Sequence, residues 1–191
     1  MCAIEYYTYD DYVTWEGDWE LINGIAISRH GSVAMAPAPM RKHQNIAGQI
    51  LTQFNNQIEE CERCEALMEE DWKIGFDTVL RPDVVLICDE QNDSYLTKTP
   101  EIVVEVISKS TAKKDEKHKF EIYEKEKVNY YVIVYPDELM AKIYKLENGK
   151  FDKQGDFYNQ TYLFKNTTCK PKLDFEQLFK KFKKTIGENI K

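Results

Sequence analysis

Three short runs of Val, Ile, Leu and Tyr constrain the fold of this chain more than any other feature. They span residues 84–87, 102–107 and 130–135, and apart from Glu105 each is apolar at both odd and even positions. Such runs are typical of central strands that are covered on both faces. The charged segment before the third run predicts a helix that ends near Lys127 and is capped by Ser110 or Thr111. The order strand, strand, helix, strand indicates a mixed α/β sheet with a crossover connection.

Further elements surround these runs. Asn23-Gly24 predicts a type I′ hairpin, because both residues tolerate positive φ. Apolar residues at three- and four-residue steps predict an amphipathic helix from Arg41 to about Glu60, with His43 in its first turn. The remaining expected elements are a short helix after Thr8, strands at about 66–74 and 140–146, a turn at Asn148-Gly149, and a basic final helix opened by Asp174.

The length of 191 residues indicates one domain, with a core at about residues 8–149 and a C-terminal hairpin and basic helix at 150–191. No apolar run approaches the ~20 residues that a membrane helix needs, and the first residues do not resemble a signal peptide. We therefore expect no membrane partner and a cytoplasmic protein.

The five cysteines are odd in number, and a domain of this size needs no covalent staple. We therefore expect no disulfide scaffold. Cys61 and Cys64 have a C-x-x-C spacing, but no second pair follows to complete a tetrahedral zinc set. The sequence favours a structural role for these two residues near a helix end.

The net charge of −7 argues against a protein that coats nucleic acid non-specifically. The charge is unevenly distributed, because residues 165–191 contain eight lysines against three acids. A second basic cluster comprises lysines 109, 113, 114, 117 and 119. Either cluster could contact phosphates or form a solvated face.

Two acids stand where the fold alone would not place them. Asp83 begins one apolar run and Glu105 lies inside the next. A carboxylate in a buried strand usually persists only when it is paired or binds a metal. Mg²⁺ takes one or two carboxylates and keeps several waters, so two acids on adjacent strands suit it. The alternative is a salt bridge from Glu105 to a nearby lysine.

Several motifs around these acids occur in a fixed order between about Thr8 and Gly149. They are Trp19-Glu20-Leu21-Ile22-Asn23-Gly24, Met35-Ala36-Pro37-Ala38-Pro39 with His43, Arg81-Pro82-Asp83-Val84-Val85, Glu105 to Thr111, Lys119 to Tyr123, and Tyr130 to Pro136. Together they resemble the Uma-two family of the PD-(D/E)XK restriction-endonuclease-like superfamily. The resemblance implies an α/β (α+β) fold, with a mixed β-sheet core flanked by helices and an N-terminal β-hairpin.

The resemblance also implies a Mg²⁺-dependent endonuclease that hydrolyses phosphodiester bonds in DNA, with Asp83 and Glu105 as metal ligands and Mn²⁺ as an expected substitute. A lysine should assist the attacking water, but Ile107 stands where the superfamily motif has lysine. The resemblance points instead to Lys119 on the following helix, and Lys109 is the competitor. Catalysis would then combine the metal ion with electrostatic stabilisation by the lysine.

Glu20 and His43 are further site candidates from the same resemblance. Glu20 precedes the hairpin turn, where the family uses an additional acid. His43 could contact phosphate or donate a proton to the leaving group, because its unperturbed pKa of ~6.5 allows both charge states. A hydrogen-bonded structural role is the alternative for His43.

The sequence leaves two functions open. The first is a DNA-cleaving enzyme that acts as a homodimer, since duplex cleavage by a single-site core needs two copies. The second is a catalytically weak or inactive relative that serves as a nucleic-acid-binding or assembly module. Ile107 and the negative net charge favour the second, whereas Asp83, Glu105 and Lys119 favour the first.

Overall fold

A computed structural model describes residues 5–29, 41–107 and 115–188. The three apolar runs form the strands β6 (Val84–Cys88), β7 (Ile102–Val106) and β8 (Tyr130–Tyr135). They lie side by side in a six-stranded sheet of order β10-β9-β8-β7-β6-β3, in which only β7 and β8 pair in parallel. The helix α3 (Asp115–Lys125) connects these two strands, so the predicted crossover in a mixed α+β fold is confirmed.

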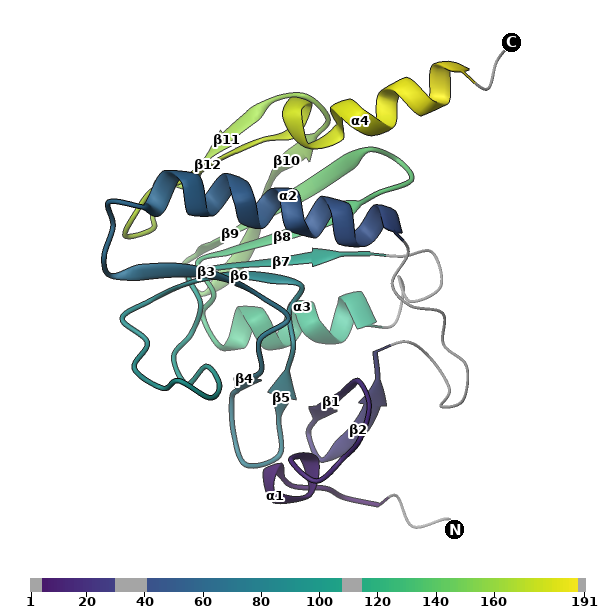
Figure 1. Ribbon diagram of the computed structural model, residues 1–191. Helices are drawn as coiled ribbons and strands as arrows, with labels where there is room; N and C mark the ends of the chain where they lie inside the picture. Colours follow the sequence, from purple (N-terminus) through teal and green to yellow (C-terminus); the bar gives the residue numbers. More distant parts are fainter. Residues whose placement is uncertain (1–4, 30–40, 108–114, 189–191) are drawn as a thin grey trace.

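Helices cover both faces of this sheet (Figure 1). The helices α2 (Arg41–Ile58) and α4 (Phe175–Glu188) pack on one face, where Ile50, Phe54 and Phe179 are fully buried. On the opposite face, Tyr123 of α3 packs in a cluster with Tyr131 and Val103. Apolar side chains on both faces of the central strands explain why the runs lack alternation.

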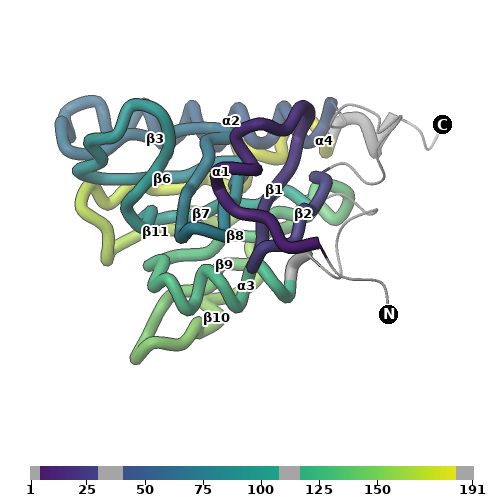
Figure 2. The backbone as a smooth tube through the Cα atoms, turned by 90° about the horizontal axis from the view of Figure 1, so that it is seen from below, coloured from purple at the N-terminus to yellow at the C-terminus, as the bar shows by residue number. Residues whose placement is uncertain are grey.

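The N-terminal residues form a second sheet of order β2-β1-β5-β4. It contains the predicted hairpin β1 (Trp19–Ile22) and β2 (Ile25–Ser28), together with β5 (Val79–Leu80) and β4 (Trp72–Lys73). Asn23 and Gly24 have φ of 49° and 76°, as a type I′ turn requires. The short helix α1 (Tyr9–Tyr12) follows Thr8 as predicted, and Figure 2 shows this N-terminal unit beside α3.

The single strand predicted at residues 66–74 is wrong. The segment divides into β3 (Cys64–Met68) at the edge of the large sheet and β4 in the small one. Glu69 has a φ of 52°, a left-handed conformation that breaks an extended strand. The chain turns there and passes from one sheet to the other.

The C-terminal elements follow the predicted order. The strands β9 (Met140–Glu147) and β10 (Lys150–Phe157) form a hairpin through Asn148 and Gly149, with an irregular register between Lys153 and Gly155. The small sheet of β11 (Thr161–Leu163) and β12 (Lys172–Asp174) leads into α4. Asp174 Oδ1 accepts a hydrogen bond from Gln177 N at 2.9 Å, which is the expected N-terminal cap.

The absence of disulfides predicted from the cysteine pattern is also wrong. Cys61 pairs with Cys169, and Cys64 pairs with Cys88. Cys64 and Cys88 lie directly opposite one another on β3 and β6. These pairings depend on strand order and on contacts across 108 residues, which spacing along the chain does not reveal.

Two predicted features lie outside the described residues: the proline-containing break at 36–39 and the Ser110 or Thr111 helix cap. Within the described ranges, no helix combines the length and the apolar character that crossing a membrane requires.

Candidate active site

Asp83 and Glu105 lie at one end of the pair β6 and β7. Val84 is opposite Val104 in this antiparallel pair, so the same register sets Asp83 opposite Glu105. Each acid is two residues from an apolar residue of the cluster under α3, Asp83 from Val85 and Glu105 from Val103, so both side chains point to the face that α3 covers. Their exposed fractions are 4% and 8%. The two carboxylates therefore share one buried end of the sheet.

Lys119 of α3 reaches this end and contacts two acids. Its Nζ lies 3.0 Å from Glu105 Oε1 and 2.8 Å from Glu20 Oε1. Tyr123, one turn further along α3, donates its hydroxyl to Glu105 Oε1 at 2.6 Å. Glu20 Oε1 also accepts a hydrogen bond from Arg81 N at 2.8 Å. The hairpin, α3 and β7 thus meet around one ammonium group.

Asp83 is held by different groups. Its Oδ2 accepts a hydrogen bond from Val106 N at 2.7 Å and lies 3.1 Å from His43 Nε2. Its Oδ1 lies 3.1 Å from Arg29 Nη2. His43 comes from the first turn of α2, and Arg29 follows β2. Both oxygens of Asp83 therefore face a cationic or hydrogen-bonding side chain.

Burial disfavours the charged form of both Glu105 and Lys119, but their neighbours act on the two groups differently. Burial raises the pKa of Glu105 to about 7, and the neighbouring Asp83 and Glu20 add to this increase while Lys119 opposes it. Burial disfavours the ammonium of Lys119, but the two carboxylates outweigh that effect and raise its pKa. Lys119 is therefore cationic at neutral pH.

Asp83 is the acid of the pair that stays ionised. Burial would raise its pKa, yet the hydrogen bond and charge of His43, the charge of Arg29 and the Val106 N–H together lower it. Burial likewise opposes the charged form of His43, but the bond to Asp83 raises the pKa of the imidazole. His43 Nδ1 is buried and has no hydrogen-bond partner among the described residues.

Sequence reasoning missed the arginines that connect the site to the N-terminal sheet. Arg29 contacts Asp18 at 3.2 Å as well as Asp83. Arg81 contacts the same Asp18 at 3.1 Å and Asp71 at 2.6 Å. Arg81 could have been singled out because it lies two residues before Asp83 in the Arg81-Pro82-Asp83 motif, but no local sequence pattern marks Arg29.

The two residues that complicated the lysine assignment differ in outcome. Ile107 is half-buried in the apolar cluster under α3, and its N–H donates to Val134 O at 2.8 Å. It therefore performs a packing role. Lys109 lies outside the described residues.

The donor set at this end fits a hard divalent cation. Asp83 and Glu105 offer carboxylate oxygens from neighbouring strands, which is the small protein contribution that Mg²⁺ accepts. Lys119 and Tyr123 both contact the same oxygen of Glu105, Oε1, so neither of them engages the second oxygen, Oε2. Binding at Asp83 would compete with the guanidinium of Arg29.

Comparisons with known proteins agree with the fold and identify a family. A family model described as Uma2, putative restriction endonuclease, matches residues 6–164. One similar solved structure is a putative nuclease belonging to DUF820 from Anabaena variabilis ATCC 29413, with a TM-score of 0.71 and 17% identity over 91% of this chain and 97% of that chain. At this identity the likeness shows the fold alone. No curated protein matches the chain.

Proposed function

Since the chain belongs to the Uma2 family of putative restriction endonucleases, we propose that it is a metal-dependent endonuclease that hydrolyses phosphodiester bonds in DNA. One observation carries the proposal. Asp83 and Glu105 occupy opposing positions on adjacent strands, and Lys119 lies 3.0 Å from Glu105. A buried cluster of this kind is costly in a fold that needs it only for packing.

Asp83 and Glu105 would hold Mg²⁺, and Mn²⁺ is expected to substitute. When bound, the ion polarises a phosphoryl oxygen and lowers the pKa of a coordinated water. Asp83 supports this role because its lowered pKa keeps the carboxylate ionised. Glu105 has a pKa of about 7 in the metal-free protein and supplies the second carboxylate once it is deprotonated.

Lys119 acts as a cation and not as a base. Its raised pKa keeps the ammonium protonated, so it orients the attacking water or stabilises the charge that develops on the phosphoryl group. Glu20 holds Lys119 at 2.8 Å from the hairpin side and thereby positions it. Tyr123 fixes Glu105 from the same helix.

His43 is proposed to contact the scissile phosphate or to donate a proton to the leaving group. Its imidazole lies 3.1 Å from Asp83, and the resulting rise in its pKa favours the charged, proton-donating form.

A second candidate function has one specific observation in its favour. Arg29 and His43 already face both oxygens of Asp83, which is an arrangement that could replace a metal ion altogether. In that case the protein is a catalytically inactive nuclease fold that binds nucleic acid or assembles with a partner.

The proposed partners and setting follow from the same chemistry. DNA is the proposed substrate, and the lysines of α4 and α3 are candidates for backbone contacts. A homodimer in the cytoplasm would provide two sites for two strands. Light scattering of the full chain at micromolar concentration tests the assembly, and a monomer would remove it.

The decisive experiment measures both metal binding and DNA cleavage. Calorimetric titration with Mg²⁺ and a plasmid-nicking assay with and without EDTA should be run on the wild type, Asp83→Asn and Glu105→Gln. The exposed Glu121→Gln on α3 is the matched control. We expect Asp83→Asn and Glu105→Gln to lower the rate of DNA cleavage by at least about 100-fold, since the loss of an electrostatic partner at a reacting centre costs that much. A wild type that binds DNA but neither Mg²⁺ nor Mn²⁺ would establish the second candidate.

Two lysine variants then assign the cation. Lys119→Ala should abolish metal-dependent cleavage, whereas Lys109→Ala should change it modestly. The opposite ranking would transfer the role to Lys109, and full activity in both would show that neither lysine serves the site.

A further inference from the structure

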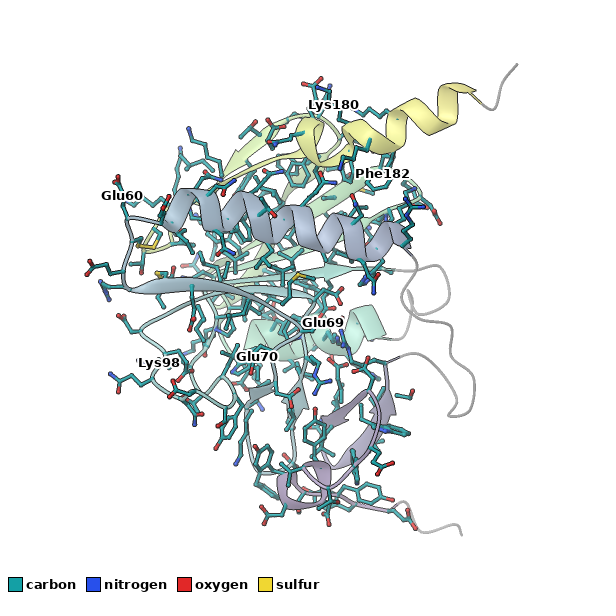
Figure 3. The ribbon with its side chains drawn as sticks, in the orientation of Figure 1. Glu60, Glu69, Glu70, Lys98, Lys180 and Phe182 are labelled. Atoms are coloured by element: carbon teal, nitrogen blue, oxygen red, sulfur yellow. A yellow bond between two sulfur atoms is a disulfide. The ribbon has the colours of Figure 1, made fainter. Side chains whose placement is uncertain are left out.

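Four cysteines meet at the end of β6 that is opposite to Asp83. Cys61 follows α2, Cys64 begins β3, Cys88 ends β6, and Cys169 lies between β11 and β12. Figure 3 draws sulfur atoms in yellow close to Glu60, the residue before Cys61. Chain segments that are far apart in the sequence thus bring their sulfurs to one corner of the fold.

The sulfurs form one cluster and not two separate bridges. The Sγ atoms of Cys61, Cys64 and Cys169 all lie within 4.8 Å of one another, although Cys64 is bonded to Cys88. Cys64 therefore connects the two disulfides. Two independent staples would not need a sulfur of one bridge beside both sulfurs of the other.

We propose that this cluster is a redox-controlled zinc site, in which the two disulfides of the oxidised protein give way on reduction to one Zn²⁺ held by Cys61, Cys64, Cys88 and Cys169. Tetrahedral zinc with Zn–S distances of ~2.3 Å sets its sulfurs about 3.8 Å apart. The three clustered sulfurs lie within 4.8 Å of one another, and opening of the Cys61–Cys169 bond lets that pair separate to the spacing that zinc requires. Cys88 joins them once its bond to Cys64 is broken.

The local backbone suits the proposed ligand set. Cys64 N donates to Cys61 O at 3.1 Å, so the C-x-x-C segment forms a tight turn that directs both sulfurs to the same side. A C-x-x-C turn joined by two cysteines from elsewhere is a common arrangement for structural zinc. The four residues are half-buried, which leaves the sulfurs accessible to a reductant and to an entering ion.

Noncovalent contacts hold the framework when the disulfides are open. Arg63 pairs with Asp89 through two hydrogen bonds of 3.0 and 2.5 Å, beside Cys64 and Cys88. The Cys169 loop is tied down by Thr168, whose N and Oγ1 donate to Glu101 at 2.8 and 2.7 Å. The ligands therefore stay close together after reduction.

The chemistry balances with a dithiol as reductant. Each disulfide accepts two electrons and two protons from one dithiol, which itself becomes a disulfide. Four thiols result, and binding of one Zn²⁺ then releases up to four protons as the thiols become thiolates. An oxidant of the disulfide class reverses the sequence and expels the ion.

Glu101 is the competing ligand, because its carboxylate lies within 4.8 Å of the sulfurs of Cys64 and Cys88. Both of its oxygens already accept hydrogen bonds from Thr168. Thiolates also outrank a carboxylate as partners of zinc in closed structural sites. The four-sulfur set is therefore the one proposed.

Thiol counting and metal analysis on the full chain test the proposal. The chain has five cysteines, so the oxidised protein should show one reactive thiol, the reduced protein five, and the reduced, Zn²⁺-loaded protein one again. Zinc analysis after gel filtration should give one ion per reduced chain and none per oxidised chain. Co²⁺ in place of Zn²⁺ should give the absorption of a tetrahedral thiolate complex.

Variants assign the ligands. Each ligand variant should weaken Zn²⁺ binding by at least about 100-fold, because even the loss of residues outside the ligand set of a metal site costs 10–100-fold. These variants are Cys61→Ser, Cys64→Ser, Cys88→Ser and Cys169→Ser. Cys2→Ser is the matched control and should bind as the wild type does. A reduced wild type that retains no zinc and keeps five reactive thiols would overturn the proposal without any variant. Loss of binding in Glu101→Gln with retention in Cys88→Ser would overturn the four-sulfur set.

Discussion

The two ends of β6 each join segments that are far apart in the sequence, but they do so by different interactions. At the Asp83 end, segments from the hairpin, α2, β7 and α3 are joined by ion pairs and hydrogen bonds. At the Cys88 end, disulfides join the segment after α2 to the loop between β11 and β12, and β3 to β6. Removal of one member of a charged cluster leaves its partners buried without a counter-charge, whereas a covalent sulfur link depends on the redox state of its surroundings. The Asp83 end is therefore sensitive to the substitution of a single charged residue, and the Cys88 end is sensitive to the redox conditions.

The largest effect on stability is expected from removing the disulfides at the Cys88 end. Closure of the 108-residue separation between Cys61 and Cys169 should stabilise the oxidised protein by about 5 kcal/mol, and that of the 24 residues between Cys64 and Cys88 by about 3 kcal/mol. Urea unfolding of the two double serine variants under oxidising conditions measures both values. An excess of dithiol in the absence of zinc should remove the difference between wild type and variants. A larger loss on removing Cys64–Cys88 would contradict this order.

The next largest effect on stability is expected from removing the buried cation at the Asp83 end. Lys119→Met leaves Glu20 and Glu105 buried without their shared cation and should lower the free energy of unfolding by about 3–5 kcal/mol. Lys117→Met is the matched control, because its side chain is 79% exposed on the same helix. The control should change stability by less than about 0.5 kcal/mol. Equal denaturation midpoints for the two variants would show that the buried pairs contribute nothing.

A smaller effect on stability is expected from removing Arg29, and this change also separates stability from metal binding. Arg29→Gln removes one charged contact to Asp83 and should lower stability by about 1.5–3 kcal/mol, since Val106 and His43 remain in place. It also removes a competing positive charge, whose repulsion of a doubly charged ion is worth about 5–6 kcal/mol at ~6 Å and an effective dielectric of 20. Calorimetry should therefore show Mg²⁺ binding at least about tenfold tighter than in the wild type. An unchanged, undetectable affinity would favour the inactive nuclease fold.

The smallest effect concerns an acid next to the sulfur end. Burial raises the pKa of Glu90, but the N–H groups of Lys98, Asn92, Thr97 and Gln91 outweigh it and lower the pKa to about 2. This contribution is full above the unfolded pKa of ~4.3 and is lost as the pH falls toward 2. Because the group is largely solvated, Glu90→Gln should cost less than about 1 kcal/mol at neutral pH. Unfolding at pH 7 and at pH 2 measures it, and a cost that grows on acidification would contradict it.

The sequence predicted the elements whose patterns are local. The central strands appeared as apolar runs, and Asn23-Gly24 placed the hairpin turn within one residue. The strand across residues 66–74 failed because the turn at Glu69 depends on which sheet each half joins. Acidic residues at 69–71 were a weak warning that the strand does not continue.

The site was predictable in its acids and less so in its cations. Asp83 and Glu105 stand out because charges are rare in apolar strands, and the structure sets them opposite one another. Arg29 escaped notice because its partner is 54 residues away and nothing in its own neighbourhood is unusual. The cysteine pairs escaped for the same reason. Long-range contacts are properties of strand order, which local patterns encode only in part.

The outer edge of β10 bears on how copies of this chain can meet. Lysines and aspartates lie along this strand, among them Lys150, Asp152, Lys153 and Asp156, and the irregular register at Gly155 interrupts its hydrogen-bonding ladder. Charged side chains and bulges on an edge discourage the addition of a strand from another molecule. Continuous sheet extension through β10 is thereby blocked, which protects the chain from fibre-like association. The proposed homodimer would accordingly form through a surface of side chains and not through a shared sheet at this edge.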